Sequence, residues 1–319
     1  MRLRGFLLAA AGLLLAGGIA EAAPKIVAIT SIVEHPALDA VRDGIKKGLA
    51  DAGLKEGEDV SYLFETAQGN PATAAQIARQ FVGENPAVIV AISTPSAQAV
   101  AAATKDVPLV FSAVTDPVGA QLVASVERPG GNVTGVSDML PVADHVALIR
   151  EIAPEAKRIG VLYNPGEANS VSSVAALRKA ADGEGMTVVE APATKSADVQ
   201  SATRSLVGKV DAIYVPTDNT IVSALESAIG VANAAKLPLF AADTDSVARG
   251  ALAAVGFNYF DVGVQTAAVV ERVLKGENPG EIPVTFASGT DLQVNKKTAD
   301  AIGLTLPPEV LQRASKVVE

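Results

Sequence analysis

The chain has 319 residues and a net charge of −9, with 26 Lys and Arg against 35 Asp and Glu and no Cys. This length is more than one hydrophobic core usually serves and predicts two domains. The missing Cys excludes disulfides and cysteine nucleophiles. An acidic chain without Lys/Arg clusters argues against a nucleic-acid partner, because phosphate binding needs basic patches.

The N-terminus predicts export. Two arginines precede an almost unbroken apolar run at residues 6–19, and residues 20–22 (Ala-Glu-Ala) supply the small-x-small pattern of a signal peptidase site. The run is short for a membrane span, which favours a signal peptide over residues 1–22, cleaved near Ala22 or Ala23, rather than an uncleaved anchor helix. No Cys follows for a lipid anchor, so we expect the mature protein in the periplasm.

The mature sequence alternates short apolar runs with longer helical stretches. Most of the runs are apolar throughout, as expected for parallel strands covered on both faces, and this alternation predicts an α/β fold with two doubly wound parallel-sheet lobes. The predicted strands are Lys25–Thr30, Val60–Glu65, Val88–Ile92, Leu109–Ala113, Arg158–Tyr163, Thr187–Ala191, Ala212–Val215, Leu239–Ala241 and Leu252–Gly256.

The alternation breaks once, at the turn-rich residues 127–132 and the short run 133–136, which we interpret as the first crossing between the lobes. Near the C-terminus, a helix at 261–275, a strand near 284–287 and a helix at 296–302 indicate that the chain crosses more than once.

These features divide the mature chain into two interleaved lobes. We predict an N-terminal lobe from residues 24–138 plus about 258–284, and a C-terminal lobe from residues 139–257 plus about 285–319.

Polar residues follow the predicted strands, where open parallel sheets bind their ligands. In the first lobe, a turn with Ser93, Thr94 and Ser96 leads into a helix, and its hydroxyls and backbone N–H groups suit a carboxylate. An ordinary N-cap is the alternative, although it would use only one of the three hydroxyls.

Two acids of the first lobe have a similar choice of roles. Glu34 is placed to accept a ligand ammonium or to complement the dipole of the following helix. After the fourth strand come Thr115 and Asp116; the acid precedes Pro117 and either points into a cleft or caps the next turn.

The second lobe repeats the pattern after three of its strands. Each loop alone fits an N-cap, because Asp, Asn and Ser are preferred there, but together the loops would converge on one crevice between the lobes. The candidate binding residues of this lobe are Asn164, Glu167, Asn169, Ser170, Asp218, Asn219 and Asp243.

Enzymatic alternatives lack their motifs. Only His35 and His145 are present, so a multi-His metal site cannot form, and there is no G-x-S-x-G elbow or phosphate-binding glycine loop. Asp243 and Asp245 would point to opposite faces of an extended segment, which argues against a catalytic pair. We therefore predict no catalytic residue, no metal and no cofactor, with His145 a surface or partly buried structural residue.

Seven short stretches, spread over nearly the whole mature chain, resemble those of a known protein family. Their order along the chain makes the resemblance specific. The chain resembles the substrate-binding proteins of ABC transporters, and more narrowly their tryptophan/tyrosine-binding (TrpX-like) branch with a type I periplasmic-binding fold. The stretches are 32–39 (IVEHPALD), 92–98 (ISTPSAQ), 111–117 (FSAVTDP), 129–138 (PGGNVTGVSD), 160–170 (GVLYNPGEANS), 211–219 (DAIYVPTDN) and 245–251 (DSVARGA).

The resemblance implies two lobes that close around a free amino acid, often an aromatic one, and pass it to the membrane permease of an importer, with no catalysis. The Ser93–Ser96 turn would hold the α-carboxylate, and Glu34, Asp116 or Asp218 the α-ammonium. The remaining second-lobe candidates would complete the opposite wall. The side-chain pocket would be lined by Ile32, Val33, Tyr163 and Tyr214, which suit an aromatic or a branched aliphatic ligand.

We expect the protein to act as a monomer. A periplasmic sensor or scaffold that signals through a protein partner would carry the same binding lobes, so it is the alternative function.

Overall fold

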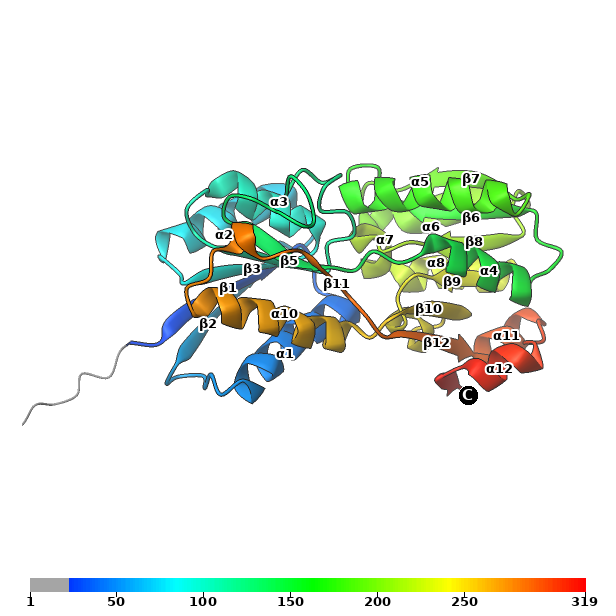
Figure 1. The fold of residues 1–319 in the computed structure, drawn as a ribbon. Coiled ribbons are helices and arrows are strands. Elements are labelled where there is room, and N and C mark those ends of the chain that lie inside the picture. Colours follow the sequence, from blue (N-terminus) through cyan, green and yellow to red (C-terminus); the bar gives the residue numbers. More distant parts are fainter. Residues whose placement is uncertain (1–22) are drawn as a thin grey trace, which may run out of the picture.

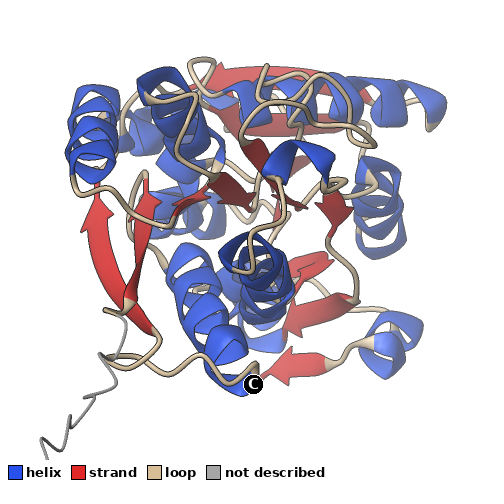
Figure 2. Ribbon diagram, turned by 60° about the vertical axis from the view of Figure 1, so that its left-hand side comes forward, coloured by secondary structure: helices blue, strands red, loops and turns tan. Residues whose placement is uncertain are grey.

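The computed structural model describes residues 23–319 and shows two α/β lobes side by side, each with a central sheet (Figure 1). Helices cover both faces of the strands, as the turned view in Figure 2 makes visible. The predicted signal peptide, residues 1–22, lies outside the described residues. Within residues 23–319, no helix is both long enough and apolar enough to cross a membrane.

The first lobe is built on a parallel sheet of six strands in the order β11-β5-β4-β3-β1-β2. The central strand β3 is buried at every residue, because helices cover both faces of the sheet. The elements of this lobe are β1 (Lys25–Ser31), α1 (Pro36–Asp51), β2 (Val60–Thr66), α2 (Pro71–Gly83), β3 (Val88–Ile92), α3 (Thr94–Ala103), β4 (Leu109–Ser112), β5 (Val133–Ser137), α10 (Tyr259–Leu274), η2 (Pro279–Glu281) and β11 (Thr285–Phe286).

The second lobe has seven strands in the order β13-β12-β10-β9-β8-β6-β7, and only the β10–β12 pair is antiparallel. Separate apolar clusters fill the two faces of this sheet. The elements are α4 (Val142–Ile152), β6 (Arg158–Tyr163), α5 (Ala168–Gly183), β7 (Thr187–Pro192), η1 (Ser196–Asp198), α6 (Val199–Leu206), β8 (Ala212–Val215), α7 (Asn219–Ser223), α8 (Leu225–Ala234), β9 (Leu239–Ala241), α9 (Asp245–Ala248), β10 (Ala253–Phe257), β12 (Thr290–Asn295), α11 (Lys296–Ile302), α12 (Pro308–Arg313) and β13 (Lys316–Val318).

Both lobes share one strand order. The sequence β2-β1-β3-β4-β5 recurs as β7-β6-β8-β9-β10, so each sheet reverses its winding once, between β1 and β3 and between β6 and β8. Sheets of this type bind ligands at the reversal, beyond the carboxyl ends of the strands. Residues that follow these four strands, His35, Ser93, Asn169 and Thr217, meet in one pocket.

The chain passes between the lobes three times, at residues 138–141, at Asn258 and at residues 287–289 (Figure 1). The run 133–136, which we had interpreted as part of the first crossing, belongs to β5 and pairs with β4 inside the first sheet. The last crossing begins after Phe286, because β11 still pairs with β5. Short connections of this kind are where hinges between lobes absorb changes in backbone angle.

Helices α1 and α10 pack closely on one face of the first sheet. A side chain at Gly44 of α1 would collide with the backbone of α10, and one at Gly263 of α10 would collide with the backbone of α1. Glycine at both positions therefore lets the two helices touch. Their close contact fixes the positions of His35 and Tyr259, which stand at the starts of the two helices.

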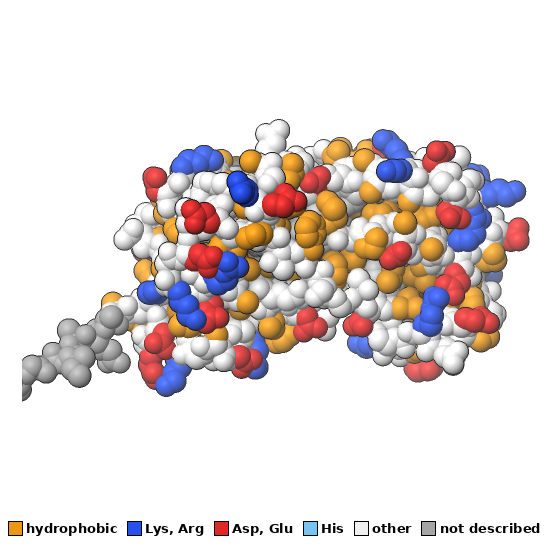
Figure 3. Space-filling model, in the orientation of Figure 1, with side chains coloured by type: hydrophobic (Ala, Val, Ile, Leu, Met, Phe, Trp, Pro, Cys, Tyr) orange, Lys and Arg blue, Asp and Glu red, His pale blue; other side chains and the backbone are white. Residues whose placement is uncertain are grey.

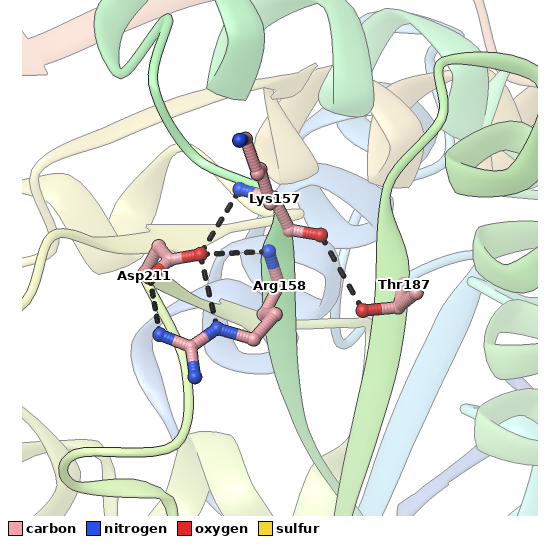
Figure 4. Close-up of polar contacts among 4 residues, drawn as sticks. All are labelled: Lys157, Arg158, Thr187 and Asp211. Atoms are coloured by element: carbon pink, nitrogen blue, oxygen red, sulfur yellow. Dashed lines mark hydrogen bonds and ion pairs between the residues drawn. The ribbon is translucent and has the colours of Figure 1, made fainter.

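An ion pair stabilises the second sheet at the end where β6 begins (Figure 4). The Asp211 carboxylate accepts hydrogen bonds from the backbone N–H groups of Lys157 and Arg158, at 3.0 and 2.9 Å, and from the Arg158 guanidinium at 2.7 Å. These bonds lower the pKa of Asp211 to about 2. Thr187 adds a contact from β7 to the carbonyl of Lys157, so this corner joins β6, β7 and the start of β8.

Charged side chains of both signs are interspersed over both lobes on the face shown in Figure 3. The same view shows a notch along the lower edge, where the two lobes meet. The binding pocket lies at this junction, because its lining residues come from both lobes.

Candidate functional site

The pocket between the lobes has an empty volume of about 360 Å³. It is lined from the first lobe, from the connecting segments and from the second lobe. The lining residues are His35, Ala37, Leu38, Ser93, Thr94, Ala113, Thr115, Asp138, Asn169, Thr217, Asp218, Asn219, Val222, Asp243 and Tyr259.

The first-lobe wall presents unused hydrogen-bonding groups. The hydroxyls of Ser93, Thr94 and Ser96 are buried and have no partner, and no side chain caps helix α3. Ser93 has φ +82° and ψ 157°, a conformation that costs a non-glycine residue free energy and is concentrated at functional sites. A buried polar group without a partner is costly, so this turn is built to receive hydrogen-bond acceptors from a ligand.

His35 also faces the pocket with an unpartnered ring nitrogen, Nδ1. Burial, together with the positive charge of Arg249, lowers the pKa of His35 to about 3. The ring is therefore neutral at physiological pH and adds no positive charge to the pocket.

Three carboxyl groups line the pocket, those of Asp138, Asp218 and Asp243. Each is almost completely buried, and burial raises the pKa of each carboxyl above its ordinary value. Among residues 23–319, no Lys or Arg lines this pocket. Buried carboxylates without a cationic partner are costly, so the acidic side of the pocket favours a positively charged ligand group.

The second-lobe wall is organised by two acids that act on the backbone. Glu167 accepts hydrogen bonds from the backbone N–H groups of Asn219 and Thr220, at 3.1 and 3.0 Å, and from both of their side chains. Asp218 caps α7 through the N–H of Ile221 at 2.8 Å and accepts from Ser170 at 2.6 Å. These bonds hold the loop after β8 in shape, and the nearby Glu167 charge further raises the pKa of Asp218.

Two direct hydrogen bonds join the lobes across the pocket region. The Thr115 and Thr217 hydroxyls lie 3.1 Å apart, and Ser172 of α5 donates to Asp116 at 3.0 Å. Since the Thr115 hydroxyl also donates to Asp138 at 3.0 Å, Thr217 is the donor to Thr115. The lobes are therefore held together by their own side chains as well as by any ligand.

Removing the Ser172–Asp116 bond is expected to favour the open form. A hydrogen bond of this kind contributes about 0.5–1.5 kcal/mol, so Ser172→Ala should weaken ligand binding roughly two- to tenfold and increase the radius of gyration of the ligand-free protein in X-ray scattering. Ser201→Ala, which removes an exposed hydroxyl that donates to the carbonyl of Asp198 just before α6, is the matched control. Identical scattering and affinity in both variants would show that this bond does not influence closure.

Seven of the thirteen candidate residues line the pocket: Ser93, Thr94, Thr115, Asn169, Asp218, Asn219 and Asp243. The other six do not line it, and their contact with a ligand stays a prediction. Ser96 is buried just behind the turn. Asn164, Glu167 and Ser170 support the second wall through hydrogen bonds. Glu34 is exposed and accepts a hydrogen bond from Gln68, and Asp116 accepts one from the N–H of Gly119.

Two pocket residues beside the crossings between the lobes, Asp138 and Tyr259, were not predicted from the sequence. His35 was not predicted to be a binding residue either. Strand-end polarity could have suggested Asp138, since it directly follows β5. None of the four side chains expected around the ligand side chain, Ile32, Val33, Tyr163 and Tyr214, lines this pocket.

A second, more apolar pocket of about 450 Å³ adjoins the first and shares Thr115, Asp138 and Thr217 with it. Tyr214 lines this second pocket and bonds Nδ1 of His145 at 2.5 Å. His145 is buried, with 4% exposure, rather than at the surface, because α4 lays it against the second sheet.

Comparison with known proteins agrees with this arrangement. Residues 26–318 match the family model described as ABC transporter substrate binding protein. A curated relative, the tyrosine-binding protein of Clostridioides difficile (strain R20291), is 43% identical over 280 residues, which cover 88% of this chain and 81% of the relative.

Two similar solved structures differ in how well they superpose on this one. An ABC domain from Streptococcus pneumoniae in complex with L-Trp is 37% identical, has a TM-score of 0.90, and the match covers 92% of this chain and 100% of that one. A ligand-free, open substrate-binding protein with adhesive properties from Clostridium difficile is 42% identical, with a TM-score of 0.70 over 92% and 99% of the two chains. The structure thus has a lobe arrangement closer to that of the complex.

The comparisons confirm the predicted fold class and the resemblance to the tryptophan/tyrosine-binding branch. The family consists of binding proteins rather than enzymes, in agreement with the prediction. The match extends over nearly all of the described residues and includes both lobes. The chain therefore belongs to the ABC transporter substrate binding protein family.

Proposed function

We propose that this protein binds a free aromatic amino acid between its lobes in the periplasm and delivers it to the permease of an ABC importer. The observation that carries the proposal is that the pocket holds two kinds of polar group. Unpartnered hydroxyls and the N-terminus of α3 form one part of it, and three buried acids with no lining cation form another. This division matches the carboxylate and the ammonium group of a zwitterion.

The aromatic side chain is supported by the apolar part of the lining and by the relatives. Ala37, Leu38, Val222 and Tyr259 give the pocket apolar surface. The relative that is 43% identical is named a tyrosine-binding protein. The solved structure that is 37% identical is a complex with L-Trp. A branched aliphatic amino acid is the alternative ligand.

Closure of the lobes supplies the mechanism. A ligand that touches both walls stabilises the closed form by the contacts that it makes only there. The three short connections between the lobes and the two direct interlobe hydrogen bonds support this proposal. The lower similarity to an open relative than to an amino-acid complex supports it as well.

Native mass spectrometry of protein purified without refolding, followed by a thermal-shift screen of amino acids, tests the proposal. We expect a co-purified mass equal to that of an aromatic amino acid, and a rise in melting temperature with L-tryptophan, L-tyrosine or L-phenylalanine, because a ligand that binds only the folded state stabilises it. Leucine and isoleucine provide the comparison. Stabilisation only by sugars or by anionic compounds would contradict an amino-acid ligand.

The carboxylate subsite has its own test. Thr94→Val keeps the shape of the side chain but removes an unpartnered hydroxyl from the pocket. Because a hydrogen bond to a charged group contributes about 1.5–3 kcal/mol, the amino acid should bind roughly 10- to 100-fold more weakly. The corresponding amine without a carboxylate should bind both proteins equally in calorimetry. Thr73→Val on α2, outside the pocket lining, should leave both affinities unchanged.

A further inference from the structure

Three acids line the pocket, and any of them could bind the ligand ammonium. Their positions and their existing hydrogen bonds distinguish among them. We propose that Asp138, at the first connection between the lobes, is the residue that binds the ammonium group. This inference rests on the proposed amino-acid ligand.

Asp138 and the carboxylate turn lie at the same end of the first sheet. Strands β3, β4 and β5 are neighbours in the sheet, with Ile92 paired to Ser112 and Ser112 to Val136. Thr94 and Asp138 therefore each lie two residues past the end of this register. The backbones of β3 and β5 are two strand spacings apart, about 10 Å.

An amino acid can bridge two side chains that extend toward each other across this backbone spacing. The ammonium nitrogen and a carboxylate oxygen of one molecule are about 3 Å apart, and a hydrogen bond of about 2.9 Å at each end brings the total to about 9 Å. A ligand can therefore hold the turn before α3 with its carboxylate and reach Asp138 with its ammonium. Both contacts come from the end of one sheet, so they do not require the second lobe.

The existing bonds of Asp138 leave it free for a cation. Its two oxygens accept from the Thr115 hydroxyl at 3.0 Å and the Tyr259 hydroxyl at 2.7 Å. An ionised carboxylate can accept about four hydrogen bonds, and Asp138 accepts no backbone N–H of another residue in the structure. It is 2% exposed and lines the pocket, so burial leaves an ionised Asp138 in need of a positive partner.

The other two acids are committed to local backbone. Asp218 accepts from the N–H groups of Asn164 and Ile221 and from Ser170. Asp243 accepts from both the N–H and the hydroxyl of Ser246 in α9. Capping of α7 accounts for Asp218, and the two bonds from Ser246 account for Asp243. Both residues lie in the second lobe, where they approach the ligand only on closure.

This placement ties the ligand to the hinge. Asp138 begins the first connection, and its partner Tyr259 directly follows the second. An ammonium bound at Asp138 would touch the segments whose backbone moves when the lobes close.

Calorimetry with Asp138→Asn tests the assignment. The amide keeps the size of the side chain but removes its charge. We expect L-tryptophan to bind at least 100-fold more weakly to this variant than to the wild type. Indole-3-propionate, which has the carboxylate and ring but no ammonium, should bind the variant as well as or better than the wild type. Asp144→Asn, which neutralises an exposed acid of α4 outside the pocket lining, is the matched control and should leave the preference between the two compounds unchanged.

A crystal structure of the wild type with L-tryptophan gives a reading that does not depend on how the variant folds. The ammonium nitrogen is expected within hydrogen-bond distance of an Asp138 oxygen. Its location on Asp218 or Asp243, or an Asp138→Asn variant that keeps the wild-type preference, would overturn this assignment while leaving the proposed function intact. A wild type that binds no amino acid would overturn both.

Discussion

Replacing Asp218 with alanine is expected to weaken amino-acid binding by more than tenfold, that is, by more than about 1.4 kcal/mol. The Asp218 carboxylate lines the pocket and accepts hydrogen bonds from Ser170 and from the backbone of Asn164 and Ile221. Its removal leaves buried donors without a partner and α7 without a cap. The second wall should then lose its shape, and titration calorimetry should register the loss.

A change in stability alone would not explain this effect. Loss of an N-cap typically costs about 0.5–2 kcal/mol, so the melting temperature should also fall. Asn70→Ala, which removes the cap of α2 through two backbone N–H groups, is the matched control, because Asn70 does not line the pocket. Asn70→Ala should lower the melting temperature with unchanged affinity, and an Asp218→Ala variant with wild-type affinity would remove Asp218 from the site.

Acid is expected to destabilise the protein through His145. Burial lowers the pKa of His145 from 6.5 to about 4, so the folded protein keeps the ring neutral where the unfolded chain protonates it. Its contribution to stability is fully present above pH 6.5 and is lost as the pH falls toward 4. Between pH 6.5 and pH 5 the loss is about 2 kcal/mol.

The comparison with His145→Gln isolates this contribution. Glutamine does not titrate and can keep a hydrogen bond to Tyr214, the present partner of His145. The unfolding free energy of the wild type, measured by denaturant titration, should fall more steeply toward pH 5 than that of the variant. The other groups titrate in both proteins and cancel in the difference. Parallel curves for the two proteins would show that His145 is not held neutral by the fold.

The fold followed from the sequence where burial controls the pattern. Runs such as Val88–Ile92 are apolar at every position because helices cover both faces of the sheet. The strands at the far edge of the second sheet escaped detection for the opposite reason. Thr290–Asn295 is polar and half-buried, and Lys316–Val318 has only three residues, so tertiary pairing rather than local composition makes them strands.

The sequence predicted which loops form the site, but not which of their residues face the pocket. Polarity after the strands predicted Ser93, Thr94, Asn169 and Asp218 as pocket candidates, and all of them line it. The same polarity could not separate residues that face the pocket from those that support it. Glu167 looks like a binding acid in sequence, yet it does not line the pocket and accepts its bonds from the loop after β8, which forms the wall. Such a distinction depends on side-chain direction, which spacing along the chain does not encode.

The central claim is that both charged ends of an amino acid are bound in the pocket between the lobes. The most direct measurement is titration calorimetry of the wild type with L-tryptophan, with tryptamine, which lacks the carboxylate, and with indole-3-propionate, which lacks the ammonium. Binding of L-tryptophan at least 100-fold tighter than that of either analogue is the predicted result. Equal affinity for all three compounds, or no binding of any aromatic amino acid, would contradict the claim.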